Sequence, residues 1–409
     1  MIDINPDRLL THLRTLATFG ADGRGVNRVA FSEADVSARR WLSERLEKAG
    51  LHASIDRIGN VYGRARNSKR TILLGSHTDS VPTGGWLDGA LGVIYGLEIA
   101  LALHEHPAEQ PIGVDVINFQ DEEGTVSPFL GSRAFCGELS DASAIALVPS
   151  QSAIGGTSGT TSIHHYERNR HLAYLEAHIE QGPKLEAAGC TIGIVRGIVG
   201  IRRFRAQAFG QADHAGTTPM DMRHDAARAL FDLMDHVYRE FPRIGGRDTV
   251  WNIGSISIRP GAANVVPQHA EMTIECRDLD EGVLEDLEQS LHACVKRYSG
   301  SVRIEIVRTY CISPIAMSQD IVKQFDSGAR RLQQKSLHLP SGAGHDAMIL
   351  AKVMPAGMMF IPSIGGRSHS SAEDSKEEHI VAGCRVFASA VDGLMSDQAT
   401  VVYTSADGE

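Results

Sequence analysis

Histidine and carboxylate side chains gather at several points of this chain where an apolar run ends. The chain contains 18 histidines, and several of them stand beside acidic residues. The candidates are three histidines and four carboxylates: His77, His178, His369, Asp79, Asp88, Glu122 and Glu123. Imidazole and carboxylate ligands without thiolates suit zinc, manganese, cobalt or nickel ions. Five ligands are enough for two ions that share one carboxylate, and paired ions polarise a carbonyl group and lower the pKa of a bridging water.

The triplet His77-x-Asp79 is typical of a metal-ligating histidine with a carboxylate that orients its ring. The alternative is a loop histidine that only forms a hydrogen bond, because this triplet arises by chance in a chain rich in histidine. Asp88 lies in a glycine-rich segment, residues 84–89, where glycines permit tight turns and a close main-chain approach. An aspartate that merely stabilises a turn is the alternative for Asp88.

The adjacent carboxylates Glu122 and Glu123 follow an apolar run and precede Gly124. Because neighbouring side chains at a strand end point in different directions, one carboxylate is available to bind a metal ion while the other accepts a proton from the attacking water. The alternative is a solvated acidic pair. His178 and His369 likewise follow apolar runs, and either histidine alone is compatible with a structural role.

The elements that must position these side chains are short apolar runs. Residues 71–74, 114–119 and 172–177 have the composition of buried strands, and each run leads directly into one of the polar clusters. Residues 90–104 predict a helix, and residues 353–361 predict a strand that ends shortly before His369. Strands that alternate with helices predict an α/β fold, whose ligands bind at the carboxyl ends of the strands.

The pattern changes after residue 200. Strands are expected at residues 201–209, 249–258, 270–277 and 301–307, with helices at 221–241 and 281–298. This β-α-β-β-α-β order is the ferredoxin-like arrangement. A helix signal at residues 321–333 and the strand at 353–361 then resume the first sheet. We therefore expect an inserted domain over residues 201–314 and a catalytic domain made of residues 1–200 and 315–409.

Composition excludes several classes of protein. The length of 409 residues favours two or three domains, and 42% hydrophobic residues with 22% charged residues are typical of a globular enzyme. A net charge of −10 argues against nucleic acid as a partner. The sequence contains no apolar stretch long enough to span a membrane, and no secretory signal is expected from its first residues. Its six cysteines are widely spaced. These features predict a cytoplasmic enzyme with reduced thiols.

Taken together, the motifs resemble those of the hydantoinase/carbamoylase amidases, a branch of the metallo-aminoacylase and carboxypeptidase clan. The similarity extends in order over nearly the whole chain. It is carried by residues 75–93 (GSHTDSVPTGGWLDGALGV), 121–124 (DEEG), 177–183 (AHIEQGP), 210–220 (GQADHAGTTPM), 342–348 (GAGHDAM) and 365–370 (GGRSHS). This branch includes N-carbamoyl-L-amino acid amidohydrolase, β-ureidopropionase and allantoate amidohydrolase.

The resemblance implies a zinc-peptidase-like catalytic domain, a mixed sheet flanked by helices, with an inserted ferredoxin-like α+β domain that serves as lid and dimerisation domain. It implies two divalent ions per subunit (zinc, manganese, cobalt or nickel). The implied roles are as follows: His77 and His178 bind one ion, Glu123 and His369 bind the other, Asp88 bridges them, Glu122 is the general base and Asp79 is the partner of His77.

The resemblance also implies a set of substrate-binding residues. His214 would steady the oxyanion, Arg277 would grip a substrate carboxylate, Asn264 would bind substrate and Gln181 would lie near the carbamoyl end. From the residues alone, a solvated strand face is the favoured interpretation of Arg277 and a turn is that of Asn264. Arg367 either contacts substrate or stacks.

Two loops depart from the family pattern. Glu122-Glu123-Gly124 is followed by Thr125-Val-Ser-Pro128 rather than an Arg-Phe pair, and the last histidine motif continues with Ser370-Ser371 rather than Ser-Pro. Both loops would border the pocket and therefore bear on the substrate. The expected reaction is hydrolysis of an N-carbamoyl-L-amino acid to amino acid, ammonia and carbon dioxide. The alternatives are allantoate or ureidoglycine amidohydrolysis, β-ureidopropionase activity, another N-acyl amino acid amidase, or an inactive metal-binding scaffold. A homodimer formed through the inserted domain is expected.

Overall fold

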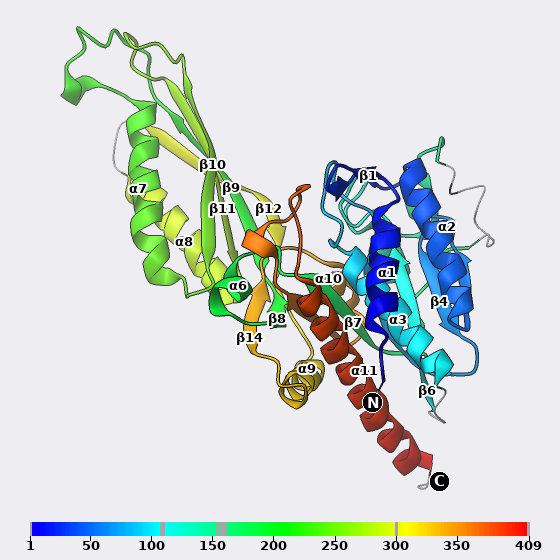
Figure 1. Cartoon of the computed structure of the whole chain (residues 1–409). Helices are drawn as coiled ribbons and strands as arrows, with labels where there is room; N and C mark the ends of the chain where they lie inside the picture. The colour runs from blue at the N-terminus through cyan, green and yellow to red at the C-terminus, as the bar shows by residue number, and fades with distance from the viewer. Residues whose placement is uncertain (1, 107–110, 153, 155–161, 299–301, 407–409) are drawn as a thin grey trace. The chain divides into compact units, whose positions relative to one another are not determined.

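A computed structural model of the chain describes residues 2–106, 111–152, 154, 162–298 and 302–406. The chain divides into two compact units, Met1–Arg196 with Met317–Glu409, and Gly197–Ala316. Figure 1 shows both. The second unit begins four residues before and ends two residues after the range 201–314 that the sequence predicts for the inserted domain. Among the described residues, no helix combines the length and the apolar character needed to cross a bilayer.

The first unit is built on a mixed sheet with the order β8-β15-β7-β5-β6-β4-β3, to which β14 adds by pairing with β8. β13, whose two residues fall at the end of the second unit's range, pairs with β8 as the ninth strand of this sheet. The strands are β3 (Leu51–Ile55), β4 (Val61–Ala65), β5 (Arg70–His77), β6 (Ile112–Phe119), β7 (His171–Ile179), β8 (Ile192–Ile198), β13 (Ile315–Ala316), β14 (Ser336–Ser341) and β15 (Ala356–Ile361). The α/β class with a mixed sheet flanked by helices is confirmed.

The four central strands of this sheet are parallel. β15 pairs with β7, β7 with β5, and β5 with β6, all in parallel register. Nearly every residue of these strands is buried, as expected for parallel strands that are covered on both faces. The outer strands β3, β4 and β8 run antiparallel to their neighbours. All carboxyl ends of the central strands therefore meet at one edge of the sheet.

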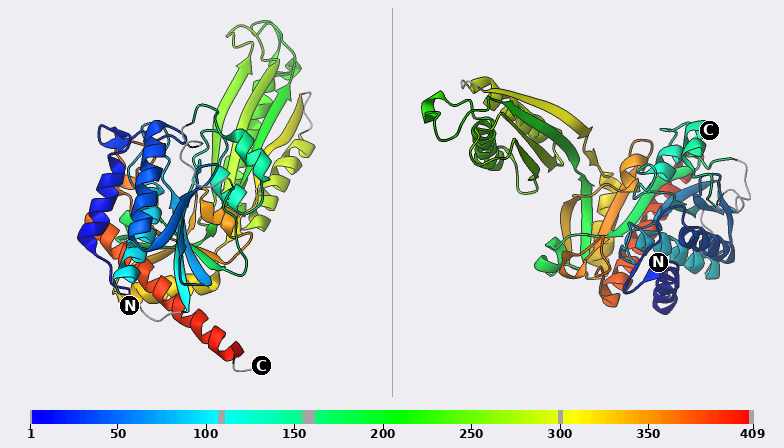
Figure 2. Two further views of the ribbon diagram at one scale, coloured as in Figure 1. Left: turned by 90° about the vertical axis from the view of Figure 1, so that its right-hand side faces the viewer. Right: turned by 90° about the horizontal axis from the view of Figure 1, so that it is seen from above.

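Helices cover this sheet. Helix α3 (Ala90–Glu105) is apolar on all sides, is almost fully buried and packs against β5, β6 and β7. Helix α2 (Glu33–Lys48) begins after Ser32, whose side chain accepts a hydrogen bond from the Asp35 main-chain N–H, as an N-cap serine does. Figures 1 and 2 show the last turns of the C-terminal helix extending beyond the sheet. The remaining elements of this unit are α1 (Pro6–Ala17), β1 (Ala21–Asp22), β2 (Gly25–Val26), α2 (Glu33–Lys48), α4 (Leu130–Phe135), α5 (Asp141–Leu147), α6 (Lys184–Ala188), α9 (Gln319–Arg331), α10 (Asp346–Leu350), η3 (Ile364–Gly366) and α11 (Glu377–Ala406).

The second unit has the ferredoxin-like topology. Its elements are β9 (Gly200–Phe209), η2 (Met220–Met222), α7 (Ala226–Ile244), β10 (Val250–Arg259), β11 (His269–Asp278), α8 (Glu281–Arg297) and β12 (Arg303–Ile312). The sheet order β10-β11-β9-β12 is antiparallel throughout. Alternate residues of β9 and β11, among them Phe204 and Ile274, form a core with Leu230 and Leu287 of the two helices. Figure 1 shows α7 and α8 along one face of this sheet.

Candidate metal centre

The candidate ligands of the first unit lie where the parallel strands end. His77 is the last residue of β5 and His178 is the last but one of β7. Glu122 and Glu123 follow β6, and His369 lies in the segment that follows β15. Because these strands are parallel neighbours, residues distant in sequence are brought to one edge of one sheet.

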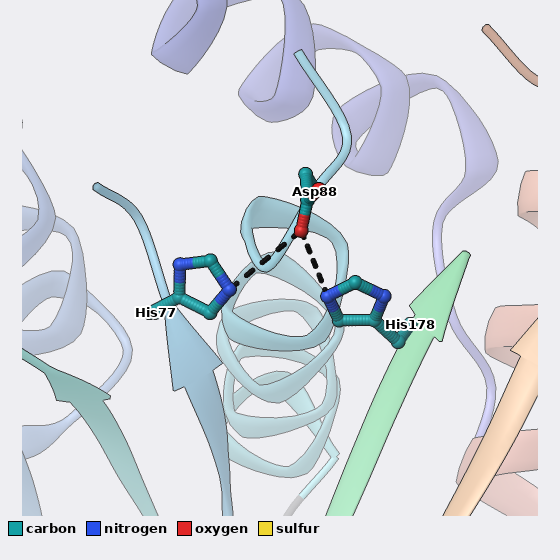
Figure 3. A group of neighbouring side chains, drawn as sticks. All are labelled: His77, Asp88 and His178. Carbon is teal, nitrogen blue, oxygen red and sulfur yellow. Dashed lines mark ion pairs between the residues drawn. The ribbon is translucent and has the colours of Figure 1, made fainter. Parts of the chain in front are cut away.

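One group of side chains comprises His77, Asp88 and His178, which offer ligand atoms within 4.8 Å of one another. Asp88 Oδ1 lies 3.0 Å from His178 Nε2 and 3.7 Å from His77 Nε2. Both histidines are 1% exposed. Figure 3 shows the two rings turned toward the same carboxylate from neighbouring strands.

The hydrogen bonds of these two histidines determine which ring nitrogen carries the proton. His77 Nδ1 lies 3.0 Å from the Asp79 carbonyl oxygen, and His178 Nδ1 lies 2.9 Å from the Ile179 carbonyl oxygen. A carbonyl only accepts, so each Nδ1 donates and each neutral ring has its lone pair at Nε2. The main-chain N–H of Gly89 donates to His178 Nε2 at 3.0 Å, in agreement with this tautomer. With Nδ1 of each ring bound to a carbonyl oxygen, both Nε2 atoms are left facing the Asp88 carboxylate, and this set of donor atoms fits a metal ion.

A second group comprises Asp88, Glu123 and His369. Asp88 Oδ2 lies 3.4 Å from His369 Nε2, and Glu123 Oε1 lies 3.6 Å from the same nitrogen. Glu123 Oε1 is buried, and no described residue forms a hydrogen bond with it. Asp88 thus directs one oxygen to each group, which is the geometry of a carboxylate that bridges two ions. His369 differs from the other histidines, because its side chain is 51% exposed.

Glu122 is buried beside the first group, with Oε2 3.6 Å from His77 Nε2. Burial, together with the neighbouring carboxylates Asp346 and Glu123, raises the pKa of Glu122 well above its usual value. A carboxyl group with a raised pKa is suited to accept and return a proton near neutral pH.

The electrostatics of the metal-free centre are dominated by crowded carboxylates. Burial and the Asp88 charge raise the pKa of Glu123 to about 9. Burial opposes the charge on His178, but the Asp88 carboxylate outweighs it and raises the pKa of His178 to about 9. The histidines in turn hold the pKa of Asp88 below its usual value, although burial acts in the other direction. Burial lowers the pKa of His77 to about 4. Crowded carboxyl groups of this kind hold protons when no ion is bound and can exchange those protons for a cation.

Asp79 supports this centre in a way that differs from the expectation. Its main-chain carbonyl, not its carboxylate, orients His77, because the carboxylate Oδ1 lies 3.8 Å from His77 Nδ1. The carboxylate instead accepts a hydrogen bond from the Glu123 main-chain N–H (3.2 Å) and lies 3.5 Å from the buried guanidinium of Arg39. Asp79 therefore contacts a candidate ligand of each group.

Gln181 lies at the centre, and Arg367 lies two residues before His369. The Gln181 amide Nε2 donates to Asp88 Oδ2 at 2.9 Å and lies 3.3 Å from His369 Nε2. Gln181 has a φ of +58°, a main-chain conformation that is uncommon for residues other than glycine. Arg367 follows η3 in the segment that carries His369 and is exposed.

The other predicted substrate residues lie in the second unit. His214 and Asn264 are neighbours there: the Ala215 main-chain N–H donates to the Asn264 carbonyl oxygen at 3.0 Å. The Gly216 N–H donates to His214 Nδ1 at 3.0 Å, so the neutral His214 ring presents Nε2–H as a donor. Arg277 lies on β11, where its guanidinium forms hydrogen bonds of 2.8 and 2.9 Å with Glu275 Oε1.

Three buried acidic residues near the centre were not predicted from the sequence. Glu176 accepts hydrogen bonds from the Ser76 hydroxyl (2.7 Å) and the Ala347 main-chain N–H (2.8 Å). Asp346 and Glu373 are also buried. The available signals were the position of Glu176 within an apolar strand and that of Asp346 in the motif GAGHDAM; Glu373, four residues after His369, carried no signal of its own.

Comparison with known proteins agrees with this architecture. The model of peptidase family M20/M25/M40 matches residues 73–393. An N-carbamoyl-L-amino acid amidohydrolase of Geobacillus stearothermophilus is 33% identical over 398 residues, which cover 94% of this chain and 97% of that protein. The allantoate amidohydrolase of Escherichia coli is 32% identical over 405 residues, which cover 93% of this chain and 98% of that protein.

Among solved structures, a hydantoinase/carbamoylase family amidase from Burkholderia phymatum is 43% identical, with a TM-score of 0.90 and coverage of 97% of this chain and 99% of that chain. The chain therefore belongs to the M20/M25/M40 peptidase family and, within it, to the hydantoinase/carbamoylase amidases. It is a hydrolase of that family.

Proposed function

We propose that this protein hydrolyses the ureido C–N bond of a small substrate that carries a carboxylate, with an N-carbamoyl-L-amino acid as first choice. The products would be an amino acid, ammonia and carbon dioxide. The observation that carries the proposal is the bridging geometry of Asp88, with Glu122 buried 3.6 Å from His77. The named relatives support the same bond type.

Two divalent ions per subunit are part of the proposal, held by His77 and His178 on one side, by Glu123 and His369 on the other, and by Asp88 between them. When bound, such ions polarise a substrate carbonyl and acidify water. Asp79 holds the His77 ring through its carbonyl oxygen, so that Nε2 stays directed at the ion site.

Glu122 is the proposed general base. Its carboxylate takes a proton from the attacking water and then returns that proton to the leaving nitrogen, which breaks the C–N bond. Burial raises the pKa of Glu122, which strengthens its carboxylate as the acceptor of the proton from water. A non-catalytic scaffold would have no need of this carboxylate, which belongs to neither ligand group.

The second unit is proposed to supply substrate contacts. Nε2–H of His214 is a donor for the oxyanion that forms at the substrate carbonyl. Arg277 is proposed to bind the substrate carboxylate, because a guanidinium forms two parallel hydrogen bonds with it. Asn264, Gln181 and Arg367 are the further proposed substrate contacts, and a homodimer is proposed to form through this unit.

Allantoate is the second candidate substrate, because the Escherichia coli allantoate amidohydrolase is nearly as similar as the first relative. Ureidoglycine, N-carbamoyl-β-alanine and other N-acyl amino acids remain alternatives. The loops at Thr125–Pro128 and Ser370–Ser371 are where substrate choice is expected to be decided.

The test is ammonia release by zinc- or manganese-loaded protein from N-carbamoyl-L-amino acids, N-carbamoyl-β-alanine and allantoate. Glu122→Gln should lower turnover by about 10²- to 10⁴-fold, because it removes the proton carrier and leaves both ligand groups intact. Metal content measured on the same samples is the control. Absence of turnover from metal-replete wild-type protein with every substrate would contradict the assignment.

A further inference from the structure

Glu373 is a buried carboxylate that joins two loops distant in sequence. It is 2% exposed. Its Oε1 accepts hydrogen bonds of 3.1 Å from the main-chain N–H groups of both Leu87 and Asp88. One carboxylate oxygen thereby fixes the main chain at the residue whose side chain faces both ligand groups.

The other oxygen of Glu373 contacts the loop that carries His369. Glu373 Oε2 accepts a hydrogen bond of 2.9 Å from the hydroxyl of Ser368, and the same hydroxyl lies 3.1 Å from Asp88 Oδ2. Ser368 directly precedes His369, which has a φ of +51°. Because this conformation is uncommon for residues other than glycine, the surrounding contacts must hold it in place.

The segment of residues 84–89 packs closely against the segment that carries Glu373. A Cβ atom added to Gly85 would lie 1.9 Å from Glu373 Oε1, so only glycine lets the main chain rest on this carboxylate. A second link lies beside the first: Trp86 Nε1 donates to Asp374 Oδ1 at 3.3 Å.

We propose that Glu373 is a positioning residue of the metal centre, which sets the geometry of Asp88 and His369 and thereby the affinity of the second ion. This proposal rests on the proposed two-ion site. His77 and His178 are fixed by the sheet, since they belong to β5 and β7. Asp88 and His369 lie outside helices and strands, so their positions depend on contacts such as these. The second group, Asp88, Glu123 and His369, is therefore the one that depends on Glu373.

The experiment is a zinc titration of the metal-free full-length protein against a chromophoric chelator, with Glu373→Asp and Glu373→Gln. Glu373→Asp keeps the charge but is one methylene too short to reach both loops. It should lower the affinity for the second ion about 10- to 100-fold and the affinity for the first ion less, as loss of a group that orients metal ligands does. Glu373→Gln keeps the length: its oxygen can accept from Leu87 and Asp88 and its amide can donate to Ser368, so both affinities should stay close to wild type.

Glu378→Asp is the matched control, because it makes the same change on an exposed part of α11. The thermal midpoint of each metal-free variant reports on folding separately from metal binding. The proposal is overturned if Glu373→Asp lowers that midpoint but leaves both zinc affinities unchanged. It is also overturned if Glu373→Gln weakens binding of the second ion and Glu373→Asp does not, since the charge of residue 373 rather than its position would then determine the affinity. A wild-type protein that binds no zinc would instead contradict the proposed function.

Discussion

At the scale of single residues, the metal-free centre stores protons that an ion would replace. Glu123 and His178 both have pKa values raised to about 9 by their surroundings. In the unfolded chain these groups titrate at their ordinary values, about 4.3 and about 6.5. Between pH 6.5 and 9 the folded metal-free protein therefore holds more protons than the unfolded chain.

This difference predicts a pH dependence of stability. As the pH rises from 6.5 to 9, the free energy of unfolding of the metal-free protein should fall, by at most about 1.4 kcal/mol per pH unit for each proton concerned. Zinc-loaded protein should show little of this slope, because the ions take the place of the protons. Urea unfolding at pH 6.5, 7.5 and 8.5 with and without chelator measures it. A metal-free protein that gains stability over this range would contradict the predicted ionisation states.

The residue types and their positions after apolar runs pointed to side chains that the structure brings together. His77, Asp88, Glu123, His178 and His369 were singled out because each follows an apolar run or lies among glycines, and they form the two groups described above. Asp79 was chosen for its carboxylate, whereas its carbonyl oxygen makes the contact, which a residue type cannot reveal. Glu373 was missed because its role depends on a contact across 285 positions of sequence.

At the scale of elements, the first residues of α3 are packed against the centre. Gly89 precedes this helix with a φ of +63°, and a Cβ atom there would lie 2.4 Å from the His77 ring. Gly89→Ala should both strain the main chain and displace His77. We expect a loss of stability of about 1–3 kcal/mol and weaker binding of the first ion.

The control for this substitution is Gly189→Ala. Gly189 has a similar φ of +61° but nothing within 4 Å of an added Cβ atom. It should lose stability through backbone strain alone and leave zinc affinity unchanged. Urea unfolding and zinc titration of both variants separate strain from displacement. Equal zinc affinity in the two variants would show that His77 does not depend on this close approach.

The elements themselves were predictable to different degrees. The buried runs that became β5, β6, β7 and β15 are apolar enough to be recognised one by one. Strands such as β3 (Leu51–Ile55) and β14 (Ser336–Ser341) mix apolar with polar residues, and they are strands because a neighbour pairs with them. Helix α7 begins at Ala226 rather than at residue 221, because the Asp225 side chain caps the Ala227 and Arg228 N–H groups.

At the scale of the whole molecule, residues Gly197–Ala316 are inserted between the two chain segments that form the first unit. The two ends of this segment meet: Gly197 and Ala316 are directly opposed in antiparallel register. Just outside them, the Met317 main-chain N–H donates to the Arg196 carbonyl oxygen at 3.0 Å. The two segments of the first unit are therefore joined by a main-chain hydrogen bond at the point where the insert begins and ends.

Because Gly197 and Ala316 are already paired, a short turn between them should close the chain of the first unit at a small cost in conformational entropy. Replacing residues 198–315 with an Asn-Gly turn should leave a hairpin that continues the first sheet. We expect this shortened chain to fold, to bind two zinc ions and to be monomeric. It should lose turnover, because it lacks the proposed substrate contacts His214, Asn264 and Arg277. Zinc titration, light scattering and the ammonia assay measure these outcomes, and a shortened chain that fails to bind zinc would show that the first unit depends on its insert. If the shortened chain folds and binds zinc, the second unit could be exchanged in evolution for another insert without loss of the proposed metal site in the first unit.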